Sequence, residues 1–234
     1  MTTVELDPAR VLVSIPSGGK RTISPVVLTD LVAIPPLKAT DRARWDAHWH
    51  EFNRTPGNIL PITPGFGTDL LRQDAALEAW TAGQGFAGVM DNCSLHACAG
   101  SGFHTDADFF PDSVFCICWL SEPAGWDLYF PFLDRRVPLE RGTVVLFDSA
   151  QPHGVVQDGQ TAFDGGAFAG RAPGYFLSLD FETSNKVRRR LAIKKMSSRG
   201  RAGFHTLGSD GERHACKDTV DSTTGRWLGR LSPT

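Results

Sequence analysis

A series of short apolar segments between residues 86 and 182 constrains the fold of this chain more than any other feature. The segments at residues 114–120, 127–132, 143–147 and 175–181 are rich in Val, Ile, Leu and Phe, and turn-forming residues separate them. Several short strands at this spacing are typical of a β-sandwich or a β-barrel. The sequence therefore predicts a mainly β domain.

The last of these segments shows the clearest strand pattern. Its large apolar residues occupy every second position, and side-chain direction repeats with the same period in a strand. We therefore expect one buried face formed by Tyr175, Leu177, Leu179 and Phe181.

Two helices are expected ahead of the strands, at residues 40–53 and 69–82. In the first helix, Trp45, Trp49 and Phe52 follow one another at i, i+4 and i+7, so we expect this face to pack on the core. The Pro- and Gly-rich stretch between the two helices is expected to be a loop. The helices would flank one outer face of the strands.

Length and composition are those of an ordinary globular protein. A chain of 234 residues can bury a sizeable core, and its net charge of −2 predicts no bulk attraction to nucleic acid or membranes. No apolar run approaches the roughly 20 residues that span a bilayer. The first residues also lack the pattern of a signal peptide. Cys116 and Cys118 lie in an apolar segment, so we expect buried free thiols and a cytoplasmic protein.

His104 and Asp106 form a candidate metal site. They lie two residues apart on an expected strand, so both side chains point to the same face. His153 follows the apolar segment at 143–147, and a neighbouring strand could bring it to the same place. Two imidazoles and one carboxylate leave about three open positions on an octahedral ion, as in non-heme Fe(II) oxygenases.

The residues between the two histidines carry a resemblance to a known family. A strand ends at Phe130-Pro131, and Gly142 precedes an apolar strand that ends near Phe147 and delivers His153. With the His-x-Asp pair, this set resembles the prolyl-hydroxylase-like branch of the Fe(II)/2-oxoglutarate-dependent oxygenases. The resemblance covers residues 86–182 and implies a double-stranded β-helix of the jelly-roll or cupin type.

The resemblance also implies an activity. His104, Asp106 and His153 match the iron ligands of the family, and 2-oxoglutarate and O₂ would take the open positions. The chain would then be a dioxygenase that converts 2-oxoglutarate to succinate and hydroxylates, or otherwise oxidises, a C–H bond. A small-molecule substrate is expected.

One family feature is missing from its usual position. The family usually binds the far carboxylate of 2-oxoglutarate with an Arg or Lys at the start of the last core strand, where this chain has Gly174. Arg171 is our candidate for that anchor, Ser178 could add a hydroxyl donor, and Arg135 and Arg136 are more distant substitutes. A cupin-like metalloenzyme with the same three ligands and no 2-oxoglutarate is the alternative.

Three aromatic or imidazole side chains near these strands are interpreted mainly as packing residues. His96 is expected to line a pocket or pack in the core rather than bind metal, and Trp119 and Trp126 are expected in the core.

The C-terminal part has a different character. We expect one oxygenase-like domain at residues 1–185 and a separate tail at 186–234, polar and possibly mobile. Residues 186–201 carry eight basic and no acidic side chains, and part of this run fits a short amphipathic helix. The run could bind nucleic acid or a carrier protein, which leaves a nucleic-acid-binding or partner-binding module as a further alternative.

Overall fold

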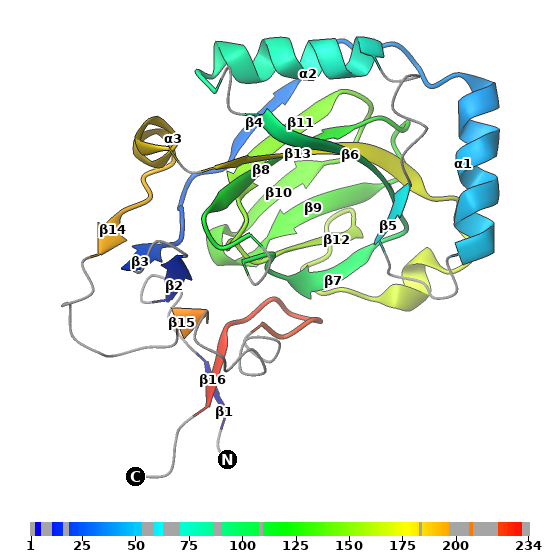
Figure 1. Ribbon diagram of the computed structural model, residues 1–234. Helices are drawn as coiled ribbons and strands as arrows, with labels where there is room; N and C mark the ends of the chain where they lie inside the picture. Colours follow the sequence, from blue (N-terminus) through cyan, green and yellow to red (C-terminus); the bar gives the residue numbers. More distant parts are fainter. Residues whose placement is uncertain are drawn as a thin grey trace.

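Two antiparallel sheets face each other in the computed structural model and form the centre of the molecule (Figure 1). The structure describes residues 3–5, 11–15, 19–52, 59–62, 71–86, 90–107, 110–182, 184–196, 206–207 and 220–230.

The larger sheet has six strands and the smaller has four. In spatial order the larger contains β4 (Leu28–Leu31), β11 (Thr143–Asp148), β8 (Ser113–Trp119), β13 (Gly174–Glu182), β6 (Met90–Cys98) and β5 (Ile59–Ile62). The smaller contains β10 (Arg135–Pro138), β9 (Trp126–Phe130), β12 (His153–Gln157) and β7 (Ser101–His104).

The chain passes back and forth between the two sheets. Strands β6, β8, β11 and β13 lie in the larger sheet, and β7, β9, β10 and β12 lie in the smaller one. Every pairing among these eight strands is antiparallel. This winding is a double-stranded β-helix, so the predicted mainly β fold with a jelly-roll core is confirmed.

Two helices cover the outer face of the larger sheet (Figure 1). They are α1 (Ala39–Phe52) and α2 (Leu71–Gly83), close to their predicted ranges. Trp45 and Trp49 are buried as predicted, but Phe52 is 53% exposed because the core contact of α1 ends one turn earlier. The predicted loop between the helices contains β5, which pairs with the edge of β6. In the described part of the chain, no helix is long and apolar enough to cross a membrane.

Alternation along β13 separates the helix-facing side of the sheet from its inner side. Tyr175, Leu177, Leu179 and Phe181 are buried in the cluster that includes the α1 and α2 tryptophans, as predicted. Phe176 belongs instead to the cluster between the two sheets. Because the side-chain period of a strand is two, one strand serves both layers.

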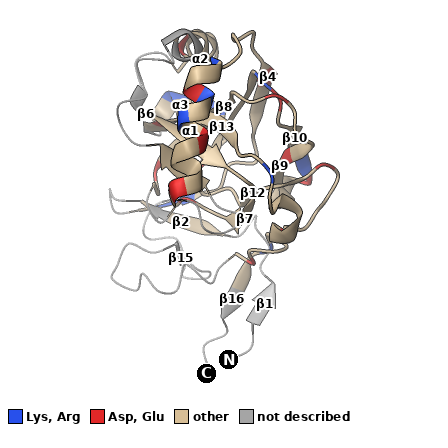
Figure 2. Ribbon diagram, turned by 90° about the vertical axis from the view of Figure 1, so that its right-hand side faces the viewer, with Lys and Arg blue, Asp and Glu red and all other residues tan. Residues whose placement is uncertain are grey.

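Charged residues lie mostly outside these layers. Figure 2 shows Lys, Arg, Asp and Glu on the helices and at the rim, whereas the central strands are largely uncharged. Cys116 and Cys118 are buried free thiols, as predicted, and burial raises the pKa of the Cys118 thiol to about 12.

The two chain ends form small sheets at one side of the β-helix (Figure 1). These contain β1 (Thr3–Glu5), β16 (Leu228–Arg230), β2 (Leu12–Ile15), β3 (Gly19–Thr22), β14 (Lys195–Met196) and β15 (Thr206–Leu207). Short 3₁₀ turns occur at Pro131–Leu133 and Gly165–Phe168. The domain boundary near residue 185 remains a prediction.

The predicted amphipathic segment in the basic run is the helix α3 (Asn185–Arg190). Ser184 caps it by accepting a hydrogen bond from the Val187 N–H. Val187 and Leu191 are buried against the main core. Their burial explains why only part of this basic run faces solvent.

A buried ion pair connects β3 to the end of β11. Both guanidinium ends of Arg21 donate to the Asp148 carboxylate at 2.7 Å, and both side chains are fully buried. The same carboxylate accepts from the backbone N–H groups of Ser24 and Ala150. Its charge is therefore compensated on every side.

We expect an Arg21→Met substitution to lower the free energy of unfolding by about 3–5 kcal/mol, because it leaves the Asp148 carboxylate buried without a cation. Urea unfolding would measure the change. The control is Arg42→Met, which removes a half-exposed partner of Asp46 and should cost under about 1 kcal/mol. Equal losses in the two variants would contradict the role assigned to the buried pair.

Candidate metal centre

Two neighbouring strands of the smaller sheet bring His104, Asp106 and His153 together. His104 ends β7 and His153 begins β12, and the two are direct partners in the antiparallel register. Asp106 follows β7 by two residues. Ligand atoms of the three side chains lie within 4.8 Å of one another, so the structure places the three sequence-predicted residues as one group.

Asp106 lies between the two imidazoles. One carboxylate oxygen is 3.8 Å from Nε2 of His104, and the other is 3.5 Å from Nε2 of His153. The Asp106 N–H donates to the Ser149 carbonyl at 2.8 Å, which fixes the backbone after β7 to the loop before β12. The carboxylate is thereby held where both histidines present the same nitrogen.

Backbone carbonyls select the tautomer of each histidine. Nδ1 of His104 is 2.8 Å from the Gly102 carbonyl, and Nδ1 of His153 is 2.8 Å from the Gln151 carbonyl. A carbonyl oxygen only accepts, so Nδ1 must carry the proton in each ring. The lone pair of each Nε2 then faces Asp106, as metal binding requires.

Burial keeps His153 neutral at physiological pH. Desolvation, followed by the nearby His104, lowers the pKa of His153 to about 4. A neutral imidazole is the form that binds a metal ion. Two neutral imidazoles and one carboxylate on one side of an ion fit Fe(II) and leave about three positions open.

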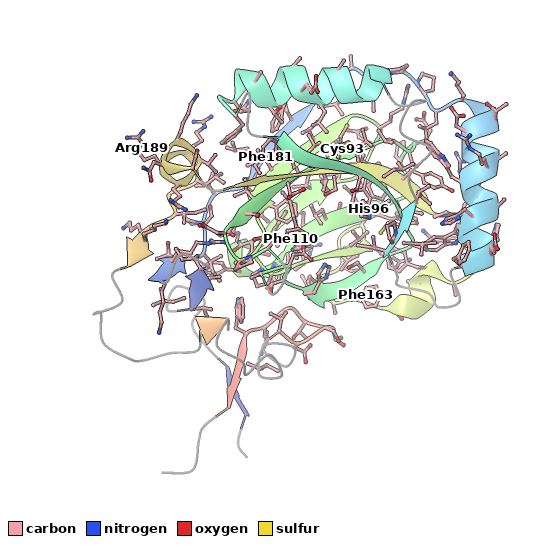
Figure 3. All side chains as sticks on the ribbon, viewed as in Figure 1. Cys93, His96, Phe110, Phe163, Phe181 and Arg189 are labelled. Carbon is pink, nitrogen blue, oxygen red and sulfur yellow. The ribbon has the colours of Figure 1, made fainter. Side chains whose placement is uncertain are left out.

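A cavity of about 250 Å³ adjoins the three side chains. Most of its wall is apolar, and apart from the two candidate ligand histidines its aromatic or imidazole rings come from the larger sheet and from the loop before β8: His96, Phe110, Phe115, Trp119, Phe147 and Phe176. Figure 3 shows His96 and Phe110 within the region enclosed by the sheets. Ser94, Ser178 and Asp180 are the polar residues that line it from β6 and β13. Such a cavity can exclude water from a small organic molecule.

The sequence analysis also made predictions for single residues around the cavity, and the structure agrees with some of them. His96 and Ser178 line the cavity as expected. Trp119 and Trp126 are buried as expected, and Trp119 also reaches the cavity. Sequence reasoning missed Asp180, although the alternation that puts Leu179 and Phe181 on the helix side puts Asp180 on the other. The same alternation could have identified it.

Arg171 lies elsewhere. It is exposed, and its guanidinium donates to the Ala124 carbonyl at 3.3 Å, outside the group of residues that line the cavity. The loop that ends at Gly170 carries Arg171 away from the start of β13. Its position therefore gives no support to the predicted role as a co-substrate anchor.

The basic run is only partly free to bind a partner. Arg188 donates to Asp112 at 2.8 Å and Arg190 to Gln84 at 3.1 Å, whereas Arg189 points outward from α3 (Figure 3). Residues 197–201, including Arg199 and Arg201, lie outside the described residues. Binding of nucleic acid or a carrier protein by this run remains a prediction.

Comparisons with known proteins give structural likenesses only. No protein-family model matches the sequence. No curated protein matches it either. Among solved structures, the chain is similar to a prolyl-4-hydroxylase from Pseudomonas putida, with 17% identity, a TM-score of 0.41 and coverage of 68% of this chain and 93% of that one.

Two further solved structures show a similar extent of likeness. One is a 2OG-Fe(II) oxygenase family protein from Burkholderia pseudomallei, with 16% identity, a TM-score of 0.39 and coverage of 68% of this chain and 85% of that one. The other is HygX from Streptomyces hygroscopicus with iron bound, with 12% identity, a TM-score of 0.37 and coverage of 68% and 82%.

We expect Asp106→Ala to abolish stoichiometric Fe(II) binding, because it removes the anionic oxygen ligand that lies between the two imidazoles. Metal content after anaerobic loading and desalting would measure the loss. His50→Ala, on the exposed side of α1, is the control and should retain one iron per chain. Full iron retention by Asp106→Ala would exclude this site.

The metal-free protein should lose stability as the pH falls from about 6.5 towards 4. Desolvation lowers the pKa of His96 to about 4, and that of His153 is lowered similarly. Between those values the unfolded chain binds protons that the folded chain does not, so stability rises with pH through this window. Each histidine accounts for up to about 3 kcal/mol.

A His96→Phe variant tests the contribution of His96 to this pH dependence. Phenylalanine keeps the ring that stacks on Phe176 but cannot be protonated. We expect the loss of stability between pH 6.5 and 4 to shrink by about half in urea unfolding of the metal-free protein. An unchanged pH dependence would show that His96 is not the buried neutral group described above.

Proposed function

We propose that this chain is a mononuclear non-heme Fe(II) oxygenase that oxidises a C–H bond of a small organic substrate. The observation that carries the proposal is the convergence of His104, Asp106 and His153 at the mouth of an apolar cavity inside a double-stranded β-helix. When bound there, Fe(II) supplies the redox chemistry that O₂ needs to react with a C–H bond.

The chain's own residues have separate roles in this proposal. His104, Asp106 and His153 hold the ion on one side, and the Gly102 and Gln151 carbonyls keep both imidazoles in the binding tautomer. Phe147 packs on the His153 ring with centroids 4.7 Å apart, so water is kept from that side of the metal. The remaining apolar wall would orient a substrate by shape.

A 2-oxo acid is the co-substrate that we include in the proposal. The overall reaction joins the 2-oxo acid, O₂ and a substrate C–H, and it yields CO₂, the shortened carboxylic acid and the hydroxylated substrate. O₂ accepts four electrons, two from cleavage of the bond between C1 and C2 of the 2-oxo acid and two from the C–H bond. The resemblance of the sequence implies 2-oxoglutarate as this acid, with succinate as its product.

A cupin-like metalloenzyme that uses no 2-oxo acid is the second candidate. It would use the same three ligands. The observation that favours it is the composition of the cavity wall, where the described residues include no Lys or Arg to receive a second carboxylate.

The proposal predicts O₂ uptake that depends on Fe(II) and on the three ligands. Anaerobically purified protein with Fe(II) and a 2-oxo acid should consume O₂ and release CO₂ when air is admitted, even without a substrate, at a slow uncoupled rate. His104→Ala should reduce the rate at least about a hundredfold because it removes a ligand.

The control for this measurement is Cys93→Ser, an exposed position on β6 outside the set of residues that line the cavity. It should keep the rate of the unmodified protein. A His104→Ala protein that is folded and equally active would overturn the proposed function.

A further inference from the structure

The end of the cavity away from the metal group has an aromatic floor. Phe176 on β13 lies directly between His96 on β6 and Trp119 on β8 in the strand register. The three rings are nearly parallel: His96 and Phe176 have centroids 5.0 Å apart and planes at 13°, and Phe176 and Trp119 have centroids 5.9 Å apart and planes at 8°. All three line the cavity.

This floor is separated from the metal end along the same sheet. Phe147, which packs on His153, pairs with Phe115, and Phe115 pairs with Asp180. The three candidate ligands and the three rings nevertheless line one cavity, so a molecule held at the metal end can extend its tail towards the rings.

Trp119 fills the place where an anchor for a second carboxylate is expected. Gly174 begins β13, and a Cβ added there would overlap Cζ2 of the Trp119 ring, with Cε2 of the same ring 3.1 Å away. Any side chain at position 174 would need the volume that the indole occupies. The absence of a side chain at Gly174 thus leaves room for the indole of Trp119. An aromatic ring then occupies the place where the resemblance implies a basic side chain.

The arginines considered as substitutes have other partners. Arg171 bonds to the Ala124 carbonyl. Arg135 donates to the Val27 carbonyl and to Thr29. Arg136 lies over the Tyr129 ring, 4.3 Å from its centroid, and donates to the Gln160 carbonyl. None of the three is among the described residues that line the cavity.

The charges at the site match a co-substrate with a single negative charge. At the metal itself, Fe(II) and the Asp106 carboxylate would sum to +1, which the single carboxylate of a 2-oxo acid neutralises, while Asp180 adds another acidic group to the cavity wall. A second carboxylate would leave an excess negative charge in an apolar wall, where an unpaired charge is strongly disfavoured. Asp180 is itself acidic and cannot replace a cation, and burial keeps His96 uncharged at neutral pH.

We propose that the co-substrate of this site is a 2-oxo acid whose tail is uncharged and apolar, so that the tail packs on the rings of His96, Phe176 and Trp119. This inference rests on the proposed function. A hydrocarbon tail gains from leaving water and needs no cation. The reaction is the one balanced above, with the shortened acid carrying the apolar tail.

Competing 2-oxo acids test the inference directly. Anaerobic Fe(II)-loaded protein would be titrated with 2-oxo-4-methylpentanoate and with 2-oxoglutarate, and the visible charge-transfer band of the bound complex would be recorded. We expect half-saturation with 2-oxo-4-methylpentanoate at a concentration at least about tenfold lower, the scale by which a pocket discriminates one unmatched group.

A paired substitution tests the role of Trp119 and Gly174. Trp119→Ala combined with Gly174→Arg places a guanidinium in the volume vacated by the indole, and the preference should reverse in favour of 2-oxoglutarate. Trp119→Ala alone is the matched comparison: it should weaken binding of the apolar acid, because one packing ring is lost, but it should create no preference for 2-oxoglutarate, because it adds no cation. Circular dichroism and iron content show whether each variant is folded. If a variant does not fold, the titration of the unmodified protein still tests the inference.

The possible outcomes separate the inference from the function on which it rests. Equal or tighter binding of 2-oxoglutarate by the unmodified protein overturns the inference and leaves the iron oxygenase intact. Iron binding without a band from either acid also overturns it and favours the cupin-like candidate. Failure to bind iron overturns the proposed function itself.

Discussion

The buried Arg21–Asp148 pair is the interaction on which the arrangement of the metal centre depends. Asp148 ends β11 and begins the loop that leads to His153, and its carboxylate accepts four hydrogen bonds from Arg21, Ser24 and Ala150. The next residue, Ser149, accepts from the Asp106 N–H and donates from its hydroxyl to the Phe110 and Ser113 carbonyls. One fixed loop therefore positions candidate ligands at the ends of two neighbouring strands of the smaller sheet, β7 and β12, and an N-terminal strand supplies the cation that holds the loop.

The alternation of side-chain direction along β13 means that one strand contributes both to the cavity and to the core beneath the helices. On β13, Leu177 and Leu179 contact the layer beneath the helices, while Phe176, Ser178 and Asp180 line the cavity. A slip of one residue in the register would move leucines into the cavity and polar residues beneath α1 and α2. The packing energy of the helix layer thus also specifies which side chains face the metal.

Sequence reasoning predicted what depends on local pattern. The strand periodicity, the helix at Trp45 and Trp49, and the His104–Asp106 pair were readable because each rests on short spacings, whereas His153 was matched to that pair through the family resemblance. The β5 edge strand was missed because Pro61 argues against a central strand, yet an edge position tolerates it. The relation between Gly174 and Trp119 was beyond reach, since 54 intervening residues separate two positions that only the pairing of β8 with β13 brings together. The position of Arg171 could not be predicted for a similar reason, because the path of a loop is not encoded in its spacing, and its role as an anchor remains a prediction.

Buried charges need a counter-charge nearby, and this requirement bears on both the packing of the fold and the apolar lining of the cavity. Arg21 is fully buried, and the structure compensates it with Asp148 at two hydrogen-bonded positions. Asp106, at the metal centre, is placed to compensate a divalent cation with the help of two neutral imidazoles. For Asp148 the fold itself supplies the counter-charge, since a buried carboxylate without one would cost several kcal/mol. The aromatic end of the cavity lacks such a counterpart among the described residues that line it, and its stacked rings instead gain from apolar contact. A molecule that extends from the metal to those rings must therefore be charged at one end and uncharged at the other.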